Sequence, residues 1–291
     1  MLFAASQTAF AGAHLRSTLC FDRRLRLHVV GKERLLFDSR YAPPCPVARD
    51  VVSLYLVLSG TMATAFGTWT GPAAWVLAET ELERVVAGVP WFRCGGERSL
   101  TVEMRVARAA VRAPVGLAAG PRALGGATVA AVETLAGFQA DTDPALALAA
   151  VHAVQAALLA DGILVAPVAL TEVEAPSMVR LWQALTPAYD AYATGITIDQ
   201  VAAASGRSSR QVRRELKQLA IDFDLFGGNF RHITRILRLR AALLLLSAPD
   251  ASVAEVAERV GYGSPVAMAR AFRDAALPPP SDVRALVRFA G

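Results

Sequence analysis

The chain has 291 residues, of which 54% are hydrophobic, and a formal net charge of +5 at pH 7. This length allows two domains, and the apolar content excludes a globally disordered chain. The longest apolar run, residues 145–160, contains His152 and Gln155 and is shorter than the roughly 20 residues that a bilayer-spanning helix needs. We therefore expect a helix buried in protein there, no membrane partner and, since residues 1–13 lack a basic segment before a long apolar run, no secretory leader. The expected location is cytoplasmic.

The three cysteines and four histidines limit metal and thiol chemistry. An odd number of widely spaced cysteines fits neither a disulfide framework nor a four-thiolate metal site. The histidines stand apart, with no H-x-H or H-E-x-x-H spacing. We expect reduced thiols, no metal, no cofactor and no enzymatic activity. The residues concerned are Cys20, Cys45, Cys94, His14, His28, His152 and His232.

Residues 21–106 show alternating or continuous apolar runs separated by Gly and Pro, which is typical of strands. Several short strands with such turns predict a sandwich or a small barrel. In particular, Ser59-Gly60 is expected to end one strand and to begin a hairpin. The predicted strands are Arg24–Val30, Val51–Leu58, Thr61–Phe66, Ala73–Leu77, Leu82–Val86 and Leu100–Val106.

This β-rich region holds five aromatic residues that are candidates for an apolar ligand pocket, the usual kind of small-molecule site. The alternative, which is the more common outcome, is that they are ordinary core residues. The residues are Phe66, Trp69, Trp75, Trp91 and Phe92.

Two helices are predicted after a connection rich in Ala, Gly and Pro at residues 107–126. The first runs from Pro144 to Ala160 and ends at Asp161-Gly162. Its small side chains could pack against a second subunit or against its own β domain, and both alternatives stay open. The second helix is expected over residues 176–193.

The C-terminal third holds the whole charge excess. Residues 195–291 contain 14 of the 30 Lys and Arg residues but only 9 of the 25 Asp and Glu residues, which accounts for the net +5. A basic segment joined to a neutral one suggests a polyanionic partner. Four helix starts with capping chemistry predict short helices here. They begin at Thr197, Ser208, Ser252 and Ser264.

One local pattern occurs twice in this segment, with an offset of 55 residues. Ala202 and Gly206 are four residues apart, as are Ala257 and Gly261, and each pair is followed by another capped helix. A small residue that allows close helix packing, followed by Gly in a left-handed turn, is typical of a helix-turn-helix. Buried positions are expected in each second helix at Val212, Leu216, Met268 and Phe272.

Residues 229–247 predict one long helix between the two units, which would fix the separation of their second helices. A separation near one turn of B-DNA, about 34 Å, would place both in successive major grooves.

The residues from Ile196 to about Leu286 resemble the DNA-binding domain of the AraC/XylS family of bacterial transcription regulators. The most specific part, Ser252–Arg284, resembles the family pattern of A-x3-G-aromatic, a helix ending in R-x-F followed by Lys or Arg, a Pro-containing turn and a final Arg. The matching residues are Ala257, Gly261, Tyr262, Arg270, Phe272, Arg273, Pro279 or Pro280, and Arg284.

The resemblance implies an α+β multidomain protein in three parts. Residues 1–110 would form a β-rich, cupin-like sensing domain, residues 111–194 a linker and helical dimerisation region, and residues 195–291 an all-α domain with two helix-turn-helix units. The implied partners are promoter DNA, a small effector, a second copy of the chain and RNA polymerase, with activation favoured over repression.

The resemblance also implies the DNA-contacting residues. From the first unit they are Ser209, Arg210, Arg213 and Arg214, with Arg210 and Arg214 favoured for bases because a guanidinium can bond both acceptors of a guanine edge. Alternatively, these arginines form a solvated face paired with Glu215 and Asp199. From the second unit they are Ser264, Val266, Ala267, Arg270 and Arg273, where the two arginines would hold phosphates and the apolar residues would touch thymine methyl groups.

The sequence departs from the family pattern in two places. Ala275-Ala276-Leu277 stands where a Gly is usual, and Pro265, Val266, Ala267 and Ala269 replace polar residues at the front of the last recognition helix. Two other functions therefore stay open. One is an Ada-like DNA repair protein with Cys45 as the methyl acceptor, although that site uses four zinc-bound cysteines. The other is a nonspecific architectural DNA binder.

Overall fold

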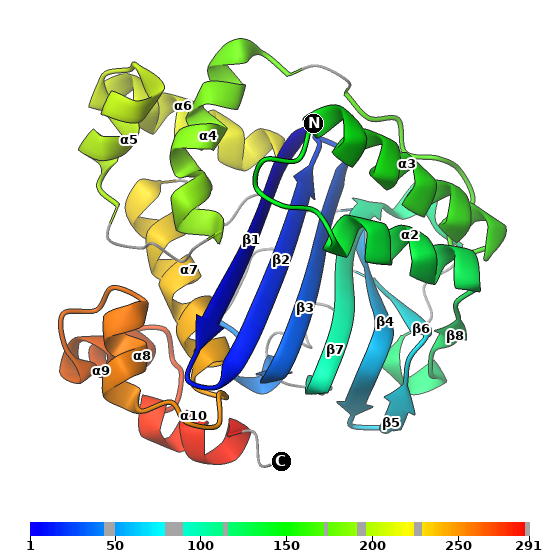
Figure 1. Cartoon of the computed structure of the whole chain (residues 1–291), viewed down its shortest axis with the longest axis horizontal. Helices are drawn as coiled ribbons and strands as arrows, with labels where there is room; N and C mark the ends of the chain where they lie inside the picture. Colours follow the sequence, from blue (N-terminus) through cyan, green and yellow to red (C-terminus); the bar gives the residue numbers. More distant parts are fainter. Residues whose placement is uncertain are drawn as a thin grey trace.

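In the N-terminal part of the protein, the residues that the structure describes form one antiparallel sheet of eight strands (Figure 1). The computed structural model describes residues 1–43, 50–78, 90–112, 116–171, 174–190, 196–223 and 229–288. The strand order is β1-β2-β3-β7-β4-β6-β8, and β5 pairs with β4. The strands are β1 (Leu2–Phe10), β2 (Ala13–Phe21), β3 (Leu25–Asp38), β4 (Val51–Thr64), β5 (Gly67–Thr70), β6 (Ala73–Ala78), β7 (Phe92–Ala107) and β8 (Arg122–Ala123).

Two features of the sheet differ from the sequence prediction. The first 21 residues form the β1–β2 hairpin, which the alternation pattern did not indicate because both faces of β2 are largely buried. The predicted break at Ser59-Gly60 is wrong: β4 continues through it with a register shift against β7, and Gly60 takes a φ of +85°. Such a bulge bends a strand without ending it. The strand predicted at Leu82–Val86 lies outside the described residues.

One face of the sheet is apolar, and the opposite face mixes polar and apolar residues. Leu27, Leu54 and Met104 lie on the apolar face, which is covered by α2 (Gly126–Ala136) and α3 (Pro144–Ala160) (Figure 1). The predicted helix from Pro144 to Ala160 is thus confirmed, and Val154 and Leu158 join it to its own sheet. Neighbouring strands place His28, Tyr55 and Glu103 in one row of the opposite face.

The candidate pocket aromatics do not gather in one cavity. Trp75 is buried and makes an edge contact with Trp69 at 5.9 Å between ring centroids. The Arg40 guanidinium lies over the Trp91 ring, and Phe66 is 52% exposed. Phe92 is buried and lines a cavity to which none of the other four aromatic residues contributes.

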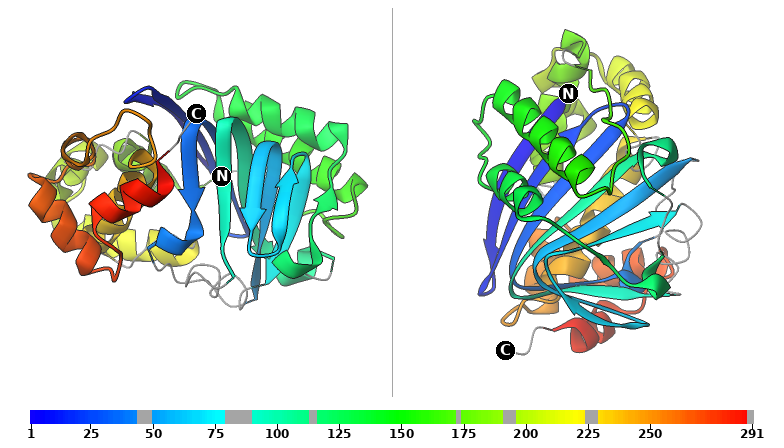
Figure 2. Two further views of the ribbon diagram at one scale, coloured as in Figure 1. Left: turned by 90° about the horizontal axis from the view of Figure 1, so that it is seen from below. Right: turned by 90° about the vertical axis from the view of Figure 1, so that its right-hand side faces the viewer.

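The helices that follow α3 lie against β1, β2 and β3, at one end of the sheet (Figure 2). The Trp182 indole N–H donates to the Phe3 carbonyl at 3.0 Å, and its ring packs edge-on against Phe21. The helices are α4 (Pro176–Asp190), α5 (Ile198–Ser205), α6 (Ser209–Asp222), α7 (Phe230–Leu245), α8 (Val253–Arg259), α9 (Pro265–Arg273) and α10 (Pro280–Val287).

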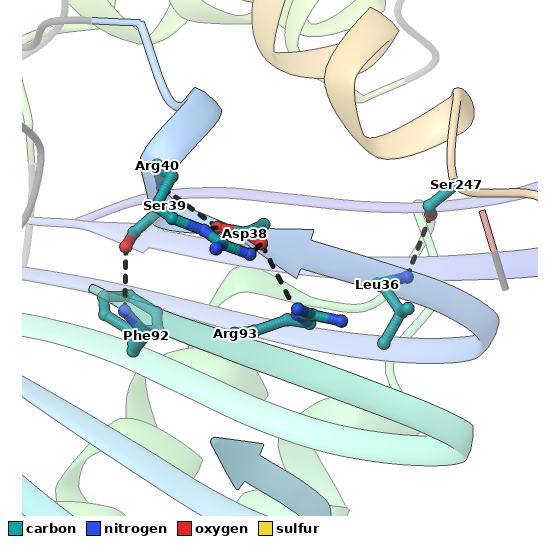
Figure 3. A network of polar contacts seen from close by, with 7 residues as sticks. All are labelled: Leu36, Asp38, Ser39, Arg40, Phe92, Arg93 and Ser247. Atoms are coloured by element: carbon teal, nitrogen blue, oxygen red, sulfur yellow. Dashed lines mark hydrogen bonds and ion pairs between the residues drawn. The ribbon is translucent and has the colours of Figure 1, made fainter. Parts of the chain in front are cut away.

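A polar network fixes the end of β3 between the sheet and α7 (Figure 3). Asp38 pairs with Arg40 and Arg93, and the Ser39 hydroxyl accepts the Phe92 N–H at 2.9 Å. Two residues before Asp38, the Leu36 N–H donates to the hydroxyl of Ser247 at 2.9 Å. Ser247 lies just after α7. This bond joins residues 211 positions apart in the chain.

Over the described residues, no helix is long and apolar enough to cross a membrane, and no group of three His, Cys, Asp or Glu side chains could hold a metal ion. Cys20 and Cys94 are free and buried, and burial raises the pKa of Cys20 to about 12. Cys45 lies outside the described residues.

We expect Ser247→Ala to lower the free energy of unfolding by about 1–3 kcal/mol, because the half-buried Leu36 N–H would lose its acceptor. The measurement is the urea midpoint of the full-length protein. Ser281→Ala, at an exposed position of α10, is the control and should change the free energy by less than about 0.5 kcal/mol. Equal midpoints for the two variants would show that the bond to Ser247 contributes nothing.

Candidate nucleic-acid interface

The first helix-turn-helix unit consists of α5 and α6. Thr197 and Ser208 each form a capping box, in which the hydroxyl accepts the N–H of the third helical residue and the Gln side chain there accepts the cap N–H. Gly206 ends α5 in the left-handed conformation, at φ +65° and ψ +33°. Because this conformation is costly for residues with a Cβ atom, glycine here allows the abrupt turn into α6.

The second unit consists of α8 and α9 and repeats this construction. Ser252 forms a capping box with Glu255, and Ser264 caps α9 before Pro265. Gly261 takes a φ of +79° in the turn. The predicted buried positions are confirmed in both units, since Val212, Leu216, Met268 and Phe272 are fully buried.

The exposed face of α6 carries Arg210, Arg213 and Arg214. The two acidic residues expected as alternative partners are otherwise engaged: Asp199 accepts the Ser209 hydroxyl at 2.6 Å, and Glu215 lies 3.8 Å from Arg207. Within the described part of the chain, none of the three arginines forms an ion pair. Their guanidinium groups are therefore accessible to an external anion.

Ser209 differs from these arginines. Its side chain is only partly exposed, and its hydroxyl is bonded to Asp199 across the turn. The bond ties α6 to α5, so Ser209 must exchange it before its hydroxyl can donate to a ligand.

The exposed face of α9 is less polar. Val266 is 73% exposed, and Ala267, Arg270 and Arg273 are exposed beside it. Ser264 is half-buried, and its hydroxyl already accepts the Ala267 N–H at 3.1 Å. The charged hydrogen-bond donors of this helix are thus the two arginines.

A basic groove between α7 and α9 was missed by the sequence analysis, which treated α7 only as a spacer. The groove has a volume of about 460 Å³, and its cationic side chains are Arg231, Arg235, Arg238 and Arg270. The guanidinium of Arg238 lies 5.8 Å from the centre of the Tyr262 ring. Residues 231, 235 and 238 follow one another at spacings of four and three, which places them on one helical face. This spacing could have identified them in the sequence.

Arg231 and Arg235 are exposed and form no ion pair with any residue that the structure describes. Among the residues that line the groove, Asp274 carries the negative charge beside four arginines. The net charge of the groove is therefore positive. Arg270 belongs both to the groove and to the exposed face of α9. The groove therefore continues the surface of the second unit along α7.

This arrangement suits a double-stranded polyanion. Two capped helices, each entered through a sharp turn, expose the start of a helix and nearby cations, which is the geometry used for major-groove entry and backbone contact. The unpaired guanidinium groups can form two parallel hydrogen bonds with a guanine edge or bind phosphate oxygens.

Comparison with known proteins agrees with this assignment. Residues 201–285 match a family model described as a helix-turn-helix domain. No curated protein matches the chain.

Solved structures that are similar to the chain include the following three. ToxT from Vibrio cholerae is 7% identical, with a TM-score of 0.34, over 89% of this chain and 98% of that one. ToxT from the same species with an unsaturated fatty acid bound is 9% identical, with a TM-score of 0.34, over 92% and 97% of the two chains. The AraC-like transcriptional activator CuxR is 13% identical, with a TM-score of 0.30, over 77% and 79%.

We expect Arg235→Ala to weaken binding to all DNA sequences alike, because a groove arginine would contact phosphates and not bases. The slope of log binding constant against log salt concentration should fall in magnitude by about 1. The measurement is a salt titration of fluorescence anisotropy with duplex DNA. Arg180→Ala, at an exposed position of α4, is the control and should leave the slope unchanged. An unchanged slope for Arg235→Ala would exclude this residue from the interface.

Proposed function

We propose that residues 201–285, which match a helix-turn-helix family model, form an AraC-type DNA-binding domain, and that the protein is a sequence-specific transcription regulator that binds promoter DNA through both units. The main support is the face of α6, where three arginines stand exposed while the nearby acids bind other partners. A solvated surface of paired charges would show the opposite arrangement.

The two units would contribute differently to binding. Arg210 and Arg214 would read bases and Arg213 the adjacent backbone, because α6 offers charged donors that match base-edge acceptors. In the second unit, Arg270 and Arg273 would hold phosphates, while Val266 and Ala267 would contact thymine methyl groups. Ser209 and Ser264 would position the starts of the two helices and approach the DNA there.

The N-terminal sheet would sense a small ligand and assemble a homodimer. Supporting the sensing role, the sheet contacts the cores of both units, so a change within the sheet has a direct route to the DNA-binding helices. Supporting dimerisation, α3 presents Leu146 at 59% exposure. In this proposal the protein acts in the cytoplasm, as an activator that contacts RNA polymerase from its promoter site.

We expect Arg214→Ala to reduce affinity for the preferred site at least tenfold, about 1.4 kcal/mol, because a bidentate base contact would be lost. The conservative variant Arg214→Lys keeps the charge but not the forked geometry. If Arg214 reads a base, Lys should restore little of the lost affinity; if it holds a phosphate, Lys should restore most of it. Both are measured by anisotropy on the preferred site and on a scrambled duplex, and unchanged affinity in Arg214→Ala would remove this residue from the interface.

The proposed function is tested by selection from genomic DNA. The purified full-length protein is incubated with sheared DNA from its source organism, and the bound fragments are sequenced, alongside the double variant Arg210→Ala/Arg214→Ala. A regulator should enrich a few promoter regions, and the double variant should lose them. Diffuse recovery that varies with salt but not with sequence, and that the double variant leaves unchanged, would instead indicate an architectural DNA binder.

A further inference from the structure

The two cysteines that the structure describes differ in their surroundings. Cys20 is fully buried in the apolar core beneath α2 and α3, where burial raises the pKa of its thiol to about 12. Cys94 is 7% exposed and lines a cavity of about 120 Å³, whose walls come from β3, β4, β7 and α7. A thiol buried in apolar surroundings is unreactive, whereas a thiol in a cavity wall is open to small oxidants.

The ammonium group of Lys32 lies beside the Cys94 sulfur. Only 3% of the surface of Lys32 is exposed, and its Nζ donates to Cys94 Sγ at 3.3 Å. Its other acceptor among the described residues is the Thr101 hydroxyl, at 3.1 Å. No carboxylate of that part of the chain forms an ion pair with it. The flexible four-carbon stem of the lysine is therefore held with its nitrogen against a thiol.

This contact favours oxidation of the sulfur. When sulfur gives an electron pair to a peroxide, negative charge develops on the departing oxygen, and a cation beside the sulfur stabilises that charge. Cysteines that are oxidised selectively lie next to such cations. Glu103, which lines the same cavity, does not cancel the cation, because it accepts the Arg105 guanidinium at 2.9 Å.

We propose that hydrogen peroxide joins Cys94 to Lys32 through a sulfur–nitrogen bond, a sulfenamide. In the first step the sulfur attacks one peroxide oxygen, the O–O bond breaks, and the other oxygen leaves as water with the thiol proton. The sulfur is thereby oxidised to a sulfenic acid and the peroxide is reduced. In the second step the ammonium group loses one proton to solvent, its nitrogen bonds to the sulfur, and the S–O bond breaks. The oxygen leaves as water with a second proton from the nitrogen.

Lys32 is the nucleophile that the site offers to a sulfenic acid at Cys94. A sulfenic acid condenses with a second thiol or with a nitrogen. Cys20 belongs to a different core cluster from Cys94. The cavity has room for only a few molecules the size of water, each of which occupies about 30 Å³ in the liquid, so a bulky thiol such as glutathione cannot enter. The amine at 3.3 Å is therefore the partner within reach.

The bond changes the surface of the sheet that faces α7. A sulfenamide nitrogen carries no charge, so the cation is lost from a cavity to which α7 contributes Arg240 and Leu244. Because α7 joins the two helix-turn-helix units, the oxidation state of Cys94 would alter the affinity for DNA. This consequence rests on the proposed function, whereas formation of the bond does not.

The test is peptide mass spectrometry of the full-length protein with the substitution Cys45→Ser, which leaves Cys20 and Cys94 as its cysteines. The protein is incubated with hydrogen peroxide and digested with chymotrypsin in the absence of reductant. We expect the peptides of Lys32 and Cys94 to be joined, with a mass two hydrogen atoms below the sum of the free peptides. Dithiothreitol added after digestion should separate them. Cys20 is the internal control and should stay a free thiol.

Two variants connect the product to Lys32. Lys32→Met removes the amine at similar length, so the sulfenic acid of Cys94 should accumulate. It is measured by unfolding the oxidised protein in dimedone, which labels sulfenic acids, and the labelling of Cys94 should rise several-fold over that of the protein with Lys32. Lys217→Met changes the other lysine of the chain, which is exposed on α6, and should form the joined peptides as before.

The proposal fails if Cys94 is oxidised without joining Lys32, if Cys20 is oxidised as readily as Cys94, or if the joined peptides retain an oxygen atom, which would indicate an N–O–S bridge.

Anisotropy on the preferred DNA site separates this result from the proposed function. Peroxide should change the affinity of the Cys45→Ser protein about fivefold or more, and Lys32→Met should abolish the change. An unchanged affinity despite the bond would overturn the regulatory consequence. Sequence-specific DNA binding without the bond would overturn only the present inference, and the bond without sequence-specific DNA binding would overturn only the regulator.

Discussion

The arrangement of the DNA-binding part depends on α7, whose apolar residues are divided between two cores. Ile233 and Leu237 pack with α4, α5, α6 and β1, whereas Leu239 and Leu245 pack with α8, α9, α10 and the strands β2 and β3. A helix fixed in two separate cores cannot rotate without disrupting both. The separation of the two recognition helices is therefore set jointly by the length of α7 and by the β1–β3 end of the sheet (Figure 2).

The face of the sheet that mixes polar and apolar residues determines how closely this helix can approach. An apolar face would close against α7 with side chains interdigitated, as the opposite face does against α2 and α3. Instead, the sheet presents Lys32 and Glu103 among apolar side chains, and α7 meets them with Arg240 and Leu244 around a remaining space. The contact between the two parts is maintained around that space by apolar clusters and by single hydrogen bonds, such as those of Ser247 and Trp182.

The DNA-binding part was the more predictable half, because its helix starts are encoded locally. Ser208 and Ser264 cap the helices that their own neighbours form, and the Gly206 and Gly261 turns follow from backbone conformation. The details of the sheet could not be predicted locally, because they depend on contacts between residues that are distant in the sequence. The burial of Lys32 depends on Cys94 and Thr101, more than 60 residues away, and the continuation of β4 through Gly60 depends on its pairing with β7. No local sequence pattern indicates the burial of Lys32 or the continuation of β4.

The two units are chemically unequal. In the proposed complex, one unit would therefore read bases and the other would bind the phosphate backbone. α6 offers guanidinium groups that can distinguish bases, whereas α9 offers Val266 and alanines beside a groove whose arginines suit phosphates. Sequence preference would then arise mainly at one end, while the other end anchors the protein on the backbone. Since α7 connects the two ends and is fixed in two apolar clusters that include residues of β1, β2 and β3, its position on the sheet sets the register between the proposed base-reading and anchoring ends. A change in the sheet that shifts α7 would therefore alter which sites are bound with both units engaged, without touching the residues proposed to contact DNA.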